Sequence, residues 1–204
     1  RICEQLFGLT SFFVNVHIKY EQPDEIKLPE TFMLIANHQS IQDIPLLIWS
    51  FPNHNLRFTA KDSLFRWVPM VSIMLRIQQH GRINRHGRAA DTMKTIERVA
   101  RKTKQGYCPV IFPEGTRTTS GSMGRFRSGI GRLAAGTDIP VVPCHLEGGI
   151  RAWPKGKLLP RPLKLHLRIG APRQYGKLEK SADSVKAICE DLQDAVGRLG
   201  AGTQ

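Results

Sequence analysis

A histidine and an aspartate stand five residues apart in the segment Asn37-His38-Gln39-Ser40-Ile41-Gln42-Asp43. The segment follows an apolar run, residues 32–36, that is typical of a buried strand, and it precedes a helical pattern. A turn between strand and helix can bring the two side chains into contact. A carboxylate bonded to one imidazole nitrogen fixes the tautomer and leaves the other nitrogen able to accept a proton from a hydroxyl. The pair is therefore a candidate general-base dyad.

The same residues also fit a purely structural role. Asp43 is a suitable cap for the helix that follows, which has Pro45 in its first turn, and Ser40 and Asp43 have the spacing of a capping box. Ser40 is a weaker candidate for a nucleophile, because no G-x-S-x-G elbow surrounds it. The spacing alone leaves the catalytic and the structural roles open.

A second set of candidate residues is Phe112-Pro113-Glu114-Gly115-Thr116-Arg117, which follows a predicted strand at residues 107–112. An arginine offers a planar fork of donors suited to phosphate, a nearby glutamate can hold that fork, and a glycine lets the backbone approach a ligand. The alternative is an ordinary surface turn with its charges in water. Since ligands gather at the carboxyl ends of strands in α/β sheets, both segments can contribute to one site.

Together these segments resemble the glycerolipid acyltransferases of the 1-acylglycerol-3-phosphate acyltransferase type. The N-H-x-S-x-x-D block of that family matches residues 37–43, and its F-P-E-G-T-R block matches residues 112–117 in full. Its V/I-P-V-x-P block matches residues 139–143. Its G-x-I-x-x-R block corresponds to residues 81–85, with the arginine one position early, and its F-K-x-G loop to residues 126–129, with arginine for lysine.

The resemblance implies an O-acyltransferase that moves a fatty acyl group from a thioester to the free hydroxyl of 1-acylglycerol-3-phosphate, forming phosphatidic acid. His38 would deprotonate the hydroxyl, Asp43 would orient His38, and the alkoxide would attack the thioester directly, with no acyl-enzyme. The residues expected to bind the acceptor are Glu114, Gly115, Thr116, Arg117, Arg85 and Arg127. The co-substrate would be an acyl-CoA or an acyl carrier protein thioester, with no bound cofactor. Another lysolipid or hydroxylated lipid is an alternative acceptor.

The charge of the chain favours anionic partners. Its formal net charge is +13, and residues 57–104 and 105–175 carry +9 and +8, whereas the two ends are slightly negative. A lysophospholipid, an anionic membrane surface and an acidic carrier protein all fit this surplus. A non-catalytic anion-binding module is the alternative of a different class. Nucleic acid is not expected, because aromatic residues make up only 7% of the chain and do not alternate with the basic ones.

The cysteines and the remaining histidines suggest no further chemistry. Cysteines stand at positions 3, 108, 144 and 189, without a C-x-x-C pair or a histidine at zinc-site spacing, so we expect neither disulfides nor a metal site. Cys144 and His145 are neighbours on a predicted strand, where adjacent side chains point to opposite faces, and both are interpreted as structural.

Apolar runs that alternate with helical patterns predict a single α/β domain with a mixed, largely parallel sheet flanked by helices. Its active site would lie at the carboxyl ends of the strands. We expect an acyltransferase domain over residues 1–204, with an N-terminal amphipathic or anchoring segment at 1–30, a catalytic core at 31–175 and a C-terminal helix at 176–204. Predicted strands cover 32–36, 56–60, 107–112, 139–143 and 163–169. Helices are predicted near Asp43, Asp62, Asp91 and Asp183, and a short helix at 130–135.

Two apolar stretches bear on membrane contact. Residues 6–18 are interrupted by polar side chains and are too short to span a bilayer, and an arginine at position 1 indicates a fragment, which an anchor could precede. Residues 63–77 are apolar nearly all round, so they are either deeply buried or in contact with lipid. We expect a membrane-associated protein on the cytoplasmic face.

Overall fold

The computed structural model describes residues 18–21, 27–40, 42–61, 81–83, 89–153, 161, 164–176 and 181–201. They form one α/β domain around a seven-stranded sheet of order β1-β7-β6-β2-β5-β3-β4. Strands β6 and β7 pair antiparallel, and the other five neighbouring pairs in this order are parallel. The predicted fold class, a mixed and largely parallel sheet flanked by helices, is therefore confirmed.

The strands have three to seven residues each and are distributed from residue 18 to residue 169. Their bounds are β1 Ile18–Glu21, β2 Met33–Ala36, β3 Asn55–Lys61, β4 Gly81–Ile83, β5 Tyr107–Ile111, β6 Val141–Glu147 and β7 Leu165–Ile169. Strand β2 is central, because it pairs with β5 on one side and with β6 on the other. Its four residues are all buried, as expected for a strand that is covered on both faces.

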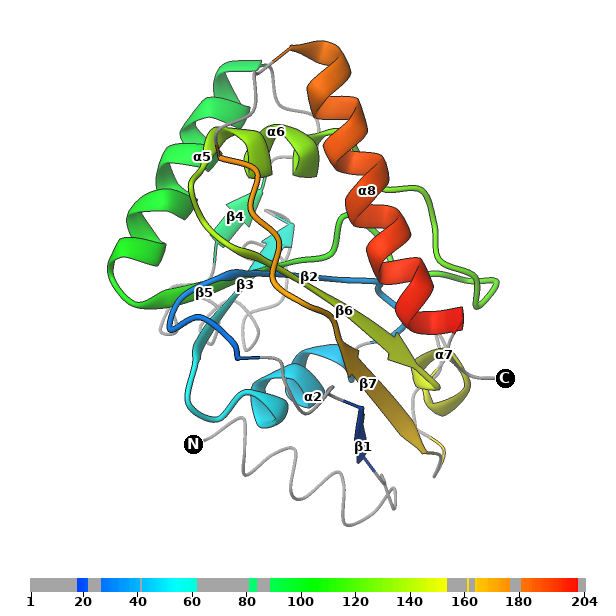
Figure 1. The fold of residues 1–204 in the computed structure, drawn as a ribbon. Coiled ribbons are helices and arrows are strands. Elements are labelled where there is room, and N and C mark those ends of the chain that lie inside the picture. The colour runs from blue at the N-terminus through cyan, green and yellow to red at the C-terminus, as the bar shows by residue number, and fades with distance from the viewer. Residues whose placement is uncertain are drawn as a thin grey trace.

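Helices cover both faces of the sheet (Figure 1). Their bounds are α2 Asp43–Ser50, α5 Ala89–Lys104, α6 Gly129–Gly136, α7 Gly149–Ala152 and α8 Ala182–Ala201. Helix α2 lies below the sheet in Figure 1, and α5, α6 and α8 lie above it. Alternate residues of β2 divide the core accordingly: Leu34 packs in the cluster that contains α2, and Met33 and Ile35 pack in the cluster that contains α6 and α8.

Several predicted elements differ in extent from the observed ones. The strand expected at 139–143 begins at Val141 and continues to Glu147, because its second half pairs with β7. Helix α8 begins at Ala182, so Asp183 lies in its first turn, and the hydroxyl of Ser181 accepts the N–H of Ser184 as a capping serine does. Strands β1 and β4 and helix α7 were not predicted. The first of these lies within the segment expected at 1–30.

Two other predictions fall outside the described residues. They are the helix after Asp62 and the surroundings of the apolar segment 63–77. Among the helices that the structure does describe, none combines the length and the apolar character needed to cross a membrane.

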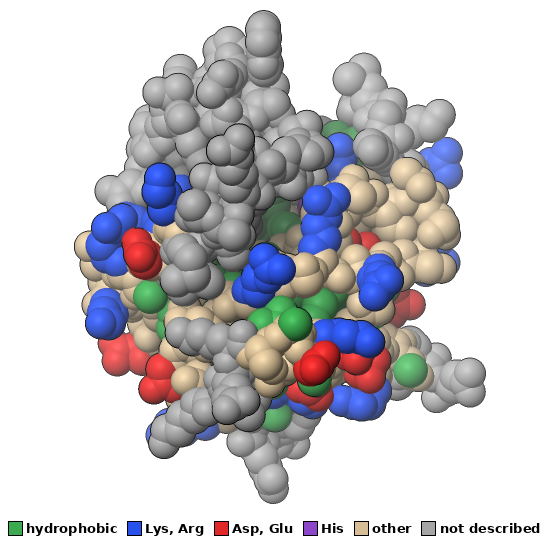
Figure 2. Space-filling model, turned by 90° about the horizontal axis from the view of Figure 1, so that it is seen from above, with side chains coloured by type: hydrophobic (Ala, Val, Ile, Leu, Met, Phe, Trp, Pro, Cys, Tyr) green, Lys and Arg blue, Asp and Glu red, His purple; other side chains and the backbone are tan. Residues whose placement is uncertain are grey.

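Part of the surplus positive charge is exposed on the face shown in Figure 2. Lys and Arg side chains surround the centre of this face, and hydrophobic side chains are visible between them. Asp and Glu side chains lie mostly toward its lower half.

Candidate active site

The candidate residues meet because three neighbouring parallel strands end at the same edge of the sheet. Strand β2 leads into residues 37–43, β5 leads into residues 112–117, and β6 leads into the glycines that begin α7. Since β5 and β6 flank β2 in parallel register, the three loops lie side by side at the carboxyl ends of their strands. The first two are the loops that the sequence predicted to share one site.

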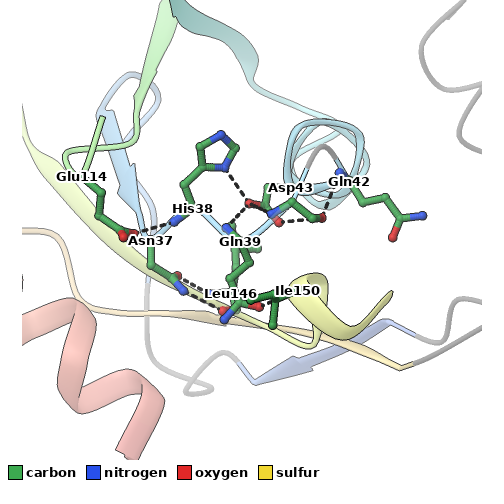
Figure 3. A network of polar contacts seen from close by, with 9 residues as sticks. Asn37, His38, Gln39, Gln42, Asp43, Glu114, Leu146 and Ile150 are labelled. Carbon is green, nitrogen blue, oxygen red and sulfur yellow. Dashed lines mark hydrogen bonds and ion pairs between the residues drawn. The ribbon is translucent and has the colours of Figure 1, made fainter. Parts of the chain in front are cut away.

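The side chains of His38 and Asp43 are in direct contact (Figure 3). Nδ1 of His38 lies 2.8 Å from Oδ2 of Asp43. A carboxylate can only accept, so this contact places the proton of a neutral imidazole on Nδ1 and leaves Nε2 as an acceptor. Asp43 is 2% exposed, whereas the His38 side chain is 17% exposed. The imidazole is thus held through Nδ1 on its buried side, and a substrate can approach its exposed side.

Asp43 also holds the turn that carries His38. Its Oδ2 accepts the backbone N–H groups of Gln39 at 2.7 Å and of Ser40 at 2.9 Å. The Ser40 hydroxyl accepts the N–H of Gln42 at 3.1 Å. Helix α2 begins at Asp43 with Gln42 as its N-cap and has no side-chain cap hydrogen bond. One oxygen of Asp43 therefore receives both the imidazole and the turn, whereas the helix cap considered from the sequence is not formed.

An aromatic ring fixes the plane of the imidazole. The ring of Phe112 stacks on that of His38, with centroids 4.0 Å apart and planes 12° from parallel. Phe112 is the first residue after β5, so the two stacked rings come from the ends of neighbouring strands. The family block includes this phenylalanine, but its contact with the histidine was not predicted from the sequence.

The side chain of Glu114 binds backbone N–H groups of two segments, the dyad turn and the loop that contains Gly124. The sequence had suggested that it would hold an arginine side chain instead. Its Oε1 accepts the N–H of His38 at 2.8 Å, and its Oε2 accepts the N–H of Gly124 at 2.7 Å. The residue is 7% exposed. Burial raises the pKa of Glu114, and the two amide hydrogen bonds offset part of that rise. Glu114 is thus placed to fix the backbone at His38 and at Gly124.

Gly115 and Arg127 pack against each other. Gly115 has a φ of +74°, and a Cβ on it would lie 2.7 Å from Nε of Arg127. That Nε donates to the carbonyl of Glu114 at 3.3 Å, and the backbone N–H of Arg127 donates to the carbonyl of Pro113 at 3.1 Å. Only glycine combines this left-handed backbone with so close an approach. The exposed Arg127 is therefore held beside the turn at residues 112–117.

The remaining predicted residues are placed to different degrees. Thr116 and Arg117 lie just before Thr118, whose N–H donates to the carbonyl of His38 at 2.9 Å, so the loop is fixed next to the dyad. Arg117 is half-buried and Thr116 is exposed. Arg85 lies outside the described residues, two positions beyond the end of β4.

Two residues that sequence reasoning left without a role support the dyad turn. The side chain of Asn37 bonds both backbone groups of Leu146 on β6, with Nδ2 donating at 2.8 Å and Oδ1 accepting at 2.7 Å. Gly149, the first residue of α7, lies so close that a Cβ on it would be 3.0 Å from Oδ1 of Asp43. The place of Asn37 in the family block could have marked it as a site residue. Its partner, Leu146, could be identified only once the order of the strands was known.

The nearby cysteine and histidine of β6 face away from each other, as the sequence predicted. Cys144 is buried in the core cluster on the α2 face, and burial raises the pKa of its thiol. Nδ1 of His145 contacts the carbonyl of Val196 on α8 at 3.0 Å, on the opposite face. Burial lowers the pKa of His145. Neither group belongs to the site.

Comparison with known proteins agrees with this geometry. The model of the family described as Acyltransferase matches residues 17–147. A 1-acyl-sn-glycerol-3-phosphate acyltransferase of Cocos nucifera is 33% identical over 139 residues, which are 68% of this chain and 44% of that protein. One of Limnanthes douglasii is 28% identical over 183 residues, which are 89% of this chain and 64% of that protein. The alignments thus span about half to two thirds of these curated relatives.

A solved structure extends the similarity to the fold. The 1-acyl-sn-glycerophosphate (LPA) acyltransferase PlsC of Thermotoga maritima has a TM-score of 0.74 and is 29% identical, covering 98% of this chain and 78% of its own. The matched family model covers the dyad turn, the 112–117 loop and β6, and it ends just before the glycines that begin α7. The chain belongs to the acyltransferase family.

Proposed function

We propose that this protein transfers a fatty acyl group from an acyl thioester to the free hydroxyl of 1-acylglycerol-3-phosphate, forming phosphatidic acid. The observation that carries the proposal is the 2.8 Å contact between His38 and Asp43 beside an arginine-containing loop. That arrangement places a base and candidate phosphate donors at one edge of the sheet. The names of the relatives from Cocos nucifera and Thermotoga maritima support this choice of acceptor.

The reaction requires a single proton carrier. Nε2 of His38 accepts the proton of the acceptor hydroxyl as its oxygen forms a bond to the thioester carbonyl carbon. Asp43, bonded to Nδ1, stabilises the imidazolium that results. The tetrahedral intermediate then collapses, the carbon–sulfur bond breaks, and the imidazolium returns its proton to the leaving thiolate. His38 is neutral again, and the products are an ester and a free thiol.

The loop after β5 and its neighbours bind the acceptor phosphate in this proposal. Arg117 and Arg127 supply charged donors, and Gly115 and Thr116 form the turn that the phosphate approaches. Arg85, two positions after the end of β4 in the sequence, is a further candidate. Glu114 positions these groups by holding His38 and Gly124 rather than by contacting an anion itself. The described part of the chain contains no cluster of three or more potential metal ligands, and the reaction above uses none.

The acyl donor is a thioester of coenzyme A or of acyl carrier protein. Both present the same carbonyl and leaving thiol, so the two donors are distinguished by assay. Turnover measured in parallel with each donor, at matched concentrations, gives the preference.

The acceptor lies in a bilayer, and therefore the protein must dock on a membrane to reach it. We place this docking on the cytoplasmic face, with residues 63–77 and the basic residues around them as the contact surface. Binding to vesicles is expected to rise with their anionic lipid content and to weaken with salt. Replacing Phe65 and Trp67 by serine should reduce it further. A folded double variant that binds vesicles as wild type does would remove this segment as the docking surface.

The decisive experiment combines a substrate panel with two variants. The purified chain is incubated with a labelled acyl thioester and lysolipids that differ in headgroup, and 1-acylglycerol-3-phosphate is expected to be the best acceptor. His38→Ala should lose activity by about 10²- to 10⁴-fold, as expected for a positioned base. His54→Gln, which changes a histidine in the turn before β3, is the matched control and should remain active.

Three results would contradict the proposal. If the folded His38→Ala variant kept wild-type turnover, the general-base role would be wrong. A better rate with another lysolipid would move the acceptor assignment to that lipid. Binding to anionic vesicles without acyl transfer from either donor would favour a non-catalytic anion-binding module.

A further inference from the structure

Helix α8 lies beyond residue 147, where the family match ends, yet it reaches the loop that carries Arg127. Oε1 of Gln193 accepts the backbone N–H of Phe126 at 2.8 Å. Phe126 is 4% exposed and precedes Arg127 directly. The contact joins residues that are 67 positions apart, so it is a tertiary link and not part of the local turn.

The loop at residues 123–128 contains no helix or strand, and its carbonyls at Phe126 and Arg127 accept the Cys189 thiol of α8, each at 3.7 Å. It is also held by its backbone N–H groups. Two of them turn toward the loop after β5: the N–H of Gly124 donates to Oε2 of Glu114, and the N–H of Arg127 donates to the carbonyl of Pro113. The amide of Phe126, between them, turns toward α8. The loop is therefore hydrogen-bonded on one side to the candidate active site and on the other to the C-terminal helix.

Helix α8 is itself anchored firmly enough to act as a support. Asp191 binds Nη1 of Arg173 at 2.5 Å and 2.6 Å through its two oxygens, and it accepts the hydroxyl of Tyr175. The backbone of α8 is so close to α6 that a Cβ on Gly131 would lie 2.2 Å from the carbonyl oxygen of Val185. The backbone position from which the Gln193 side chain extends is therefore fixed.

We infer that Gln193 is a positioning residue for the acceptor phosphate: it fixes the loop of residues 123–128, and through that loop the Arg127 guanidinium. The inference rests on the proposed function, in which Arg127 binds the phosphate. Gln193 does not touch the His38–Asp43 pair, so its loss should weaken acceptor binding more than it slows the chemical step. An amide oxygen suits this purpose because it accepts from a backbone N–H without adding a negative charge near an anionic substrate.

The test compares Gln193→Leu, which removes the acceptor at similar volume, with Gln193→Glu, which keeps an acceptor oxygen. Asp194→Asn, at the next and exposed position of α8, is the matched control. We expect Gln193→Leu to raise KM for 1-acylglycerol-3-phosphate about tenfold, with kcat within about twofold of wild type. Gln193→Glu should restore only part of the lost affinity, because its carboxylate keeps the acceptor but adds a negative charge near the anionic substrate. A KM for Gln193→Leu equal to that of the control would overturn the inference.

A double-mutant cycle separates positioning from a general effect on stability. If Gln193 acts through the loop, Gln193→Leu in an Arg127→Ala background should raise KM no further. Full additivity of the two effects would overturn the inference. Wild type that turns over no 1-acylglycerol-3-phosphate would instead contradict the proposed function.

Limited proteolysis tests the support of the loop without any activity. Arg125 and Arg127 are exposed trypsin sites within it. Gln193→Leu should increase cleavage after these arginines at least threefold under native conditions, while Asp194→Asn leaves it unchanged. Equal cleavage in Gln193→Leu and wild type would show that Gln193 does not hold the loop, whatever the enzyme turns over.

Discussion

Oε1 of Glu114 accepts the backbone N–H of His38 at 2.8 Å, although the two residues are 76 positions apart in the sequence. The contact crosses from the end of β5 to the end of β2, and the other oxygen of Glu114 holds Gly124. One buried carboxylate therefore sets the distance between His38, the proposed general base, and the loop that carries the candidate phosphate ligands. This link needs both oxygens of Glu114, because each accepts a different backbone N–H.

Glu114→Gln should disrupt the link between the two segments. The amide side chain offers one acceptor oxygen and one NH2 group, which would face a backbone N–H, so one of the two hydrogen bonds must be lost. Hydrogen bonds to buried charged groups contribute about 1.5–3 kcal/mol, and we expect kcat/KM to fall by about tenfold or more. Steady-state kinetics on the folded variant measure this. Activity equal to wild type would show that the link between the loops is dispensable.

The acid dependence of stability should report the anchoring of α8. Partial burial alone would raise the pKa of Asp191, but the hydrogen bonds from Tyr175 and Arg173 outweigh it and lower the pKa. A carboxylate with a lowered pKa in the folded state contributes stability that is present above its unfolded pKa and is lost as the pH falls through its folded pKa. The contribution is therefore complete at neutral pH.

We accordingly expect Asp191→Asn to have a lower free energy of unfolding than wild type at pH 7. The difference should shrink as the pH falls below about 4, the ordinary range of an aspartate. Urea titrations at several pH values give both quantities. A difference that stays constant down to pH 2.5 would mean that the charge of Asp191 contributes nothing.

Much of this site could be predicted where local sequence decides the geometry. The contact between His38 and Asp43 follows from a short turn after a buried strand, and both residues lie in one segment. The stacking of Phe112 and the bond from Glu114 could not be predicted in this way. They depend on β5 lying next to β2, an order that no local pattern specifies.

The extent of β6 shows a second limit of local patterns. Pro143 ends the apolar run that predicted this strand, and a proline normally argues against a central strand. In the structure the carbonyl of Pro143 accepts the N–H of Gly170, and the strand continues to Glu147 by pairing with β7. Tertiary pairing thus overrides the proline, which explains why the predicted strand stopped too early. Strands β1 and β4 were missed because their sequences, IKYE and GRI, contain charged residues and form no apolar run, unlike the four apolar residues of β2.

The absence of an acyl-enzyme in the proposed mechanism leads to a prediction about the thiols. Burial raises the pKa of Cys108, Cys144 and Cys189, so each is a protonated and poorly nucleophilic thiol at neutral pH. In a Cys3→Ser variant, the native protein should react with iodoacetamide only slowly, and the three thiols should react fully in urea. Mass spectrometry after mixing with acyl donor alone should show no adduct. A stoichiometric adduct on Ser40 or Cys144 that acceptor converts to product would establish a two-step route instead.

Gly149 packs directly against the side chain of Asp43. A Cβ on Gly149 would lie 3.0 Å from Oδ1 of Asp43 and 3.1 Å from the Ser40 hydroxyl, so Gly149→Ala must displace the turn that holds His38. A small shift of a positioned base is costly because catalysis requires hydrogen-bond geometry, and we expect kcat to fall by about tenfold to a hundredfold. Gly197→Ala is the matched control, since a Cβ there would meet only the flexible end of Met123 at 3.5 Å. The control should keep wild-type kcat and gain slightly in stability, because alanine favours the helix. If Gly149→Ala were equally active, the Asp43 turn would have room to move, and the rigid support inferred for the His38–Asp43 pair would be wrong.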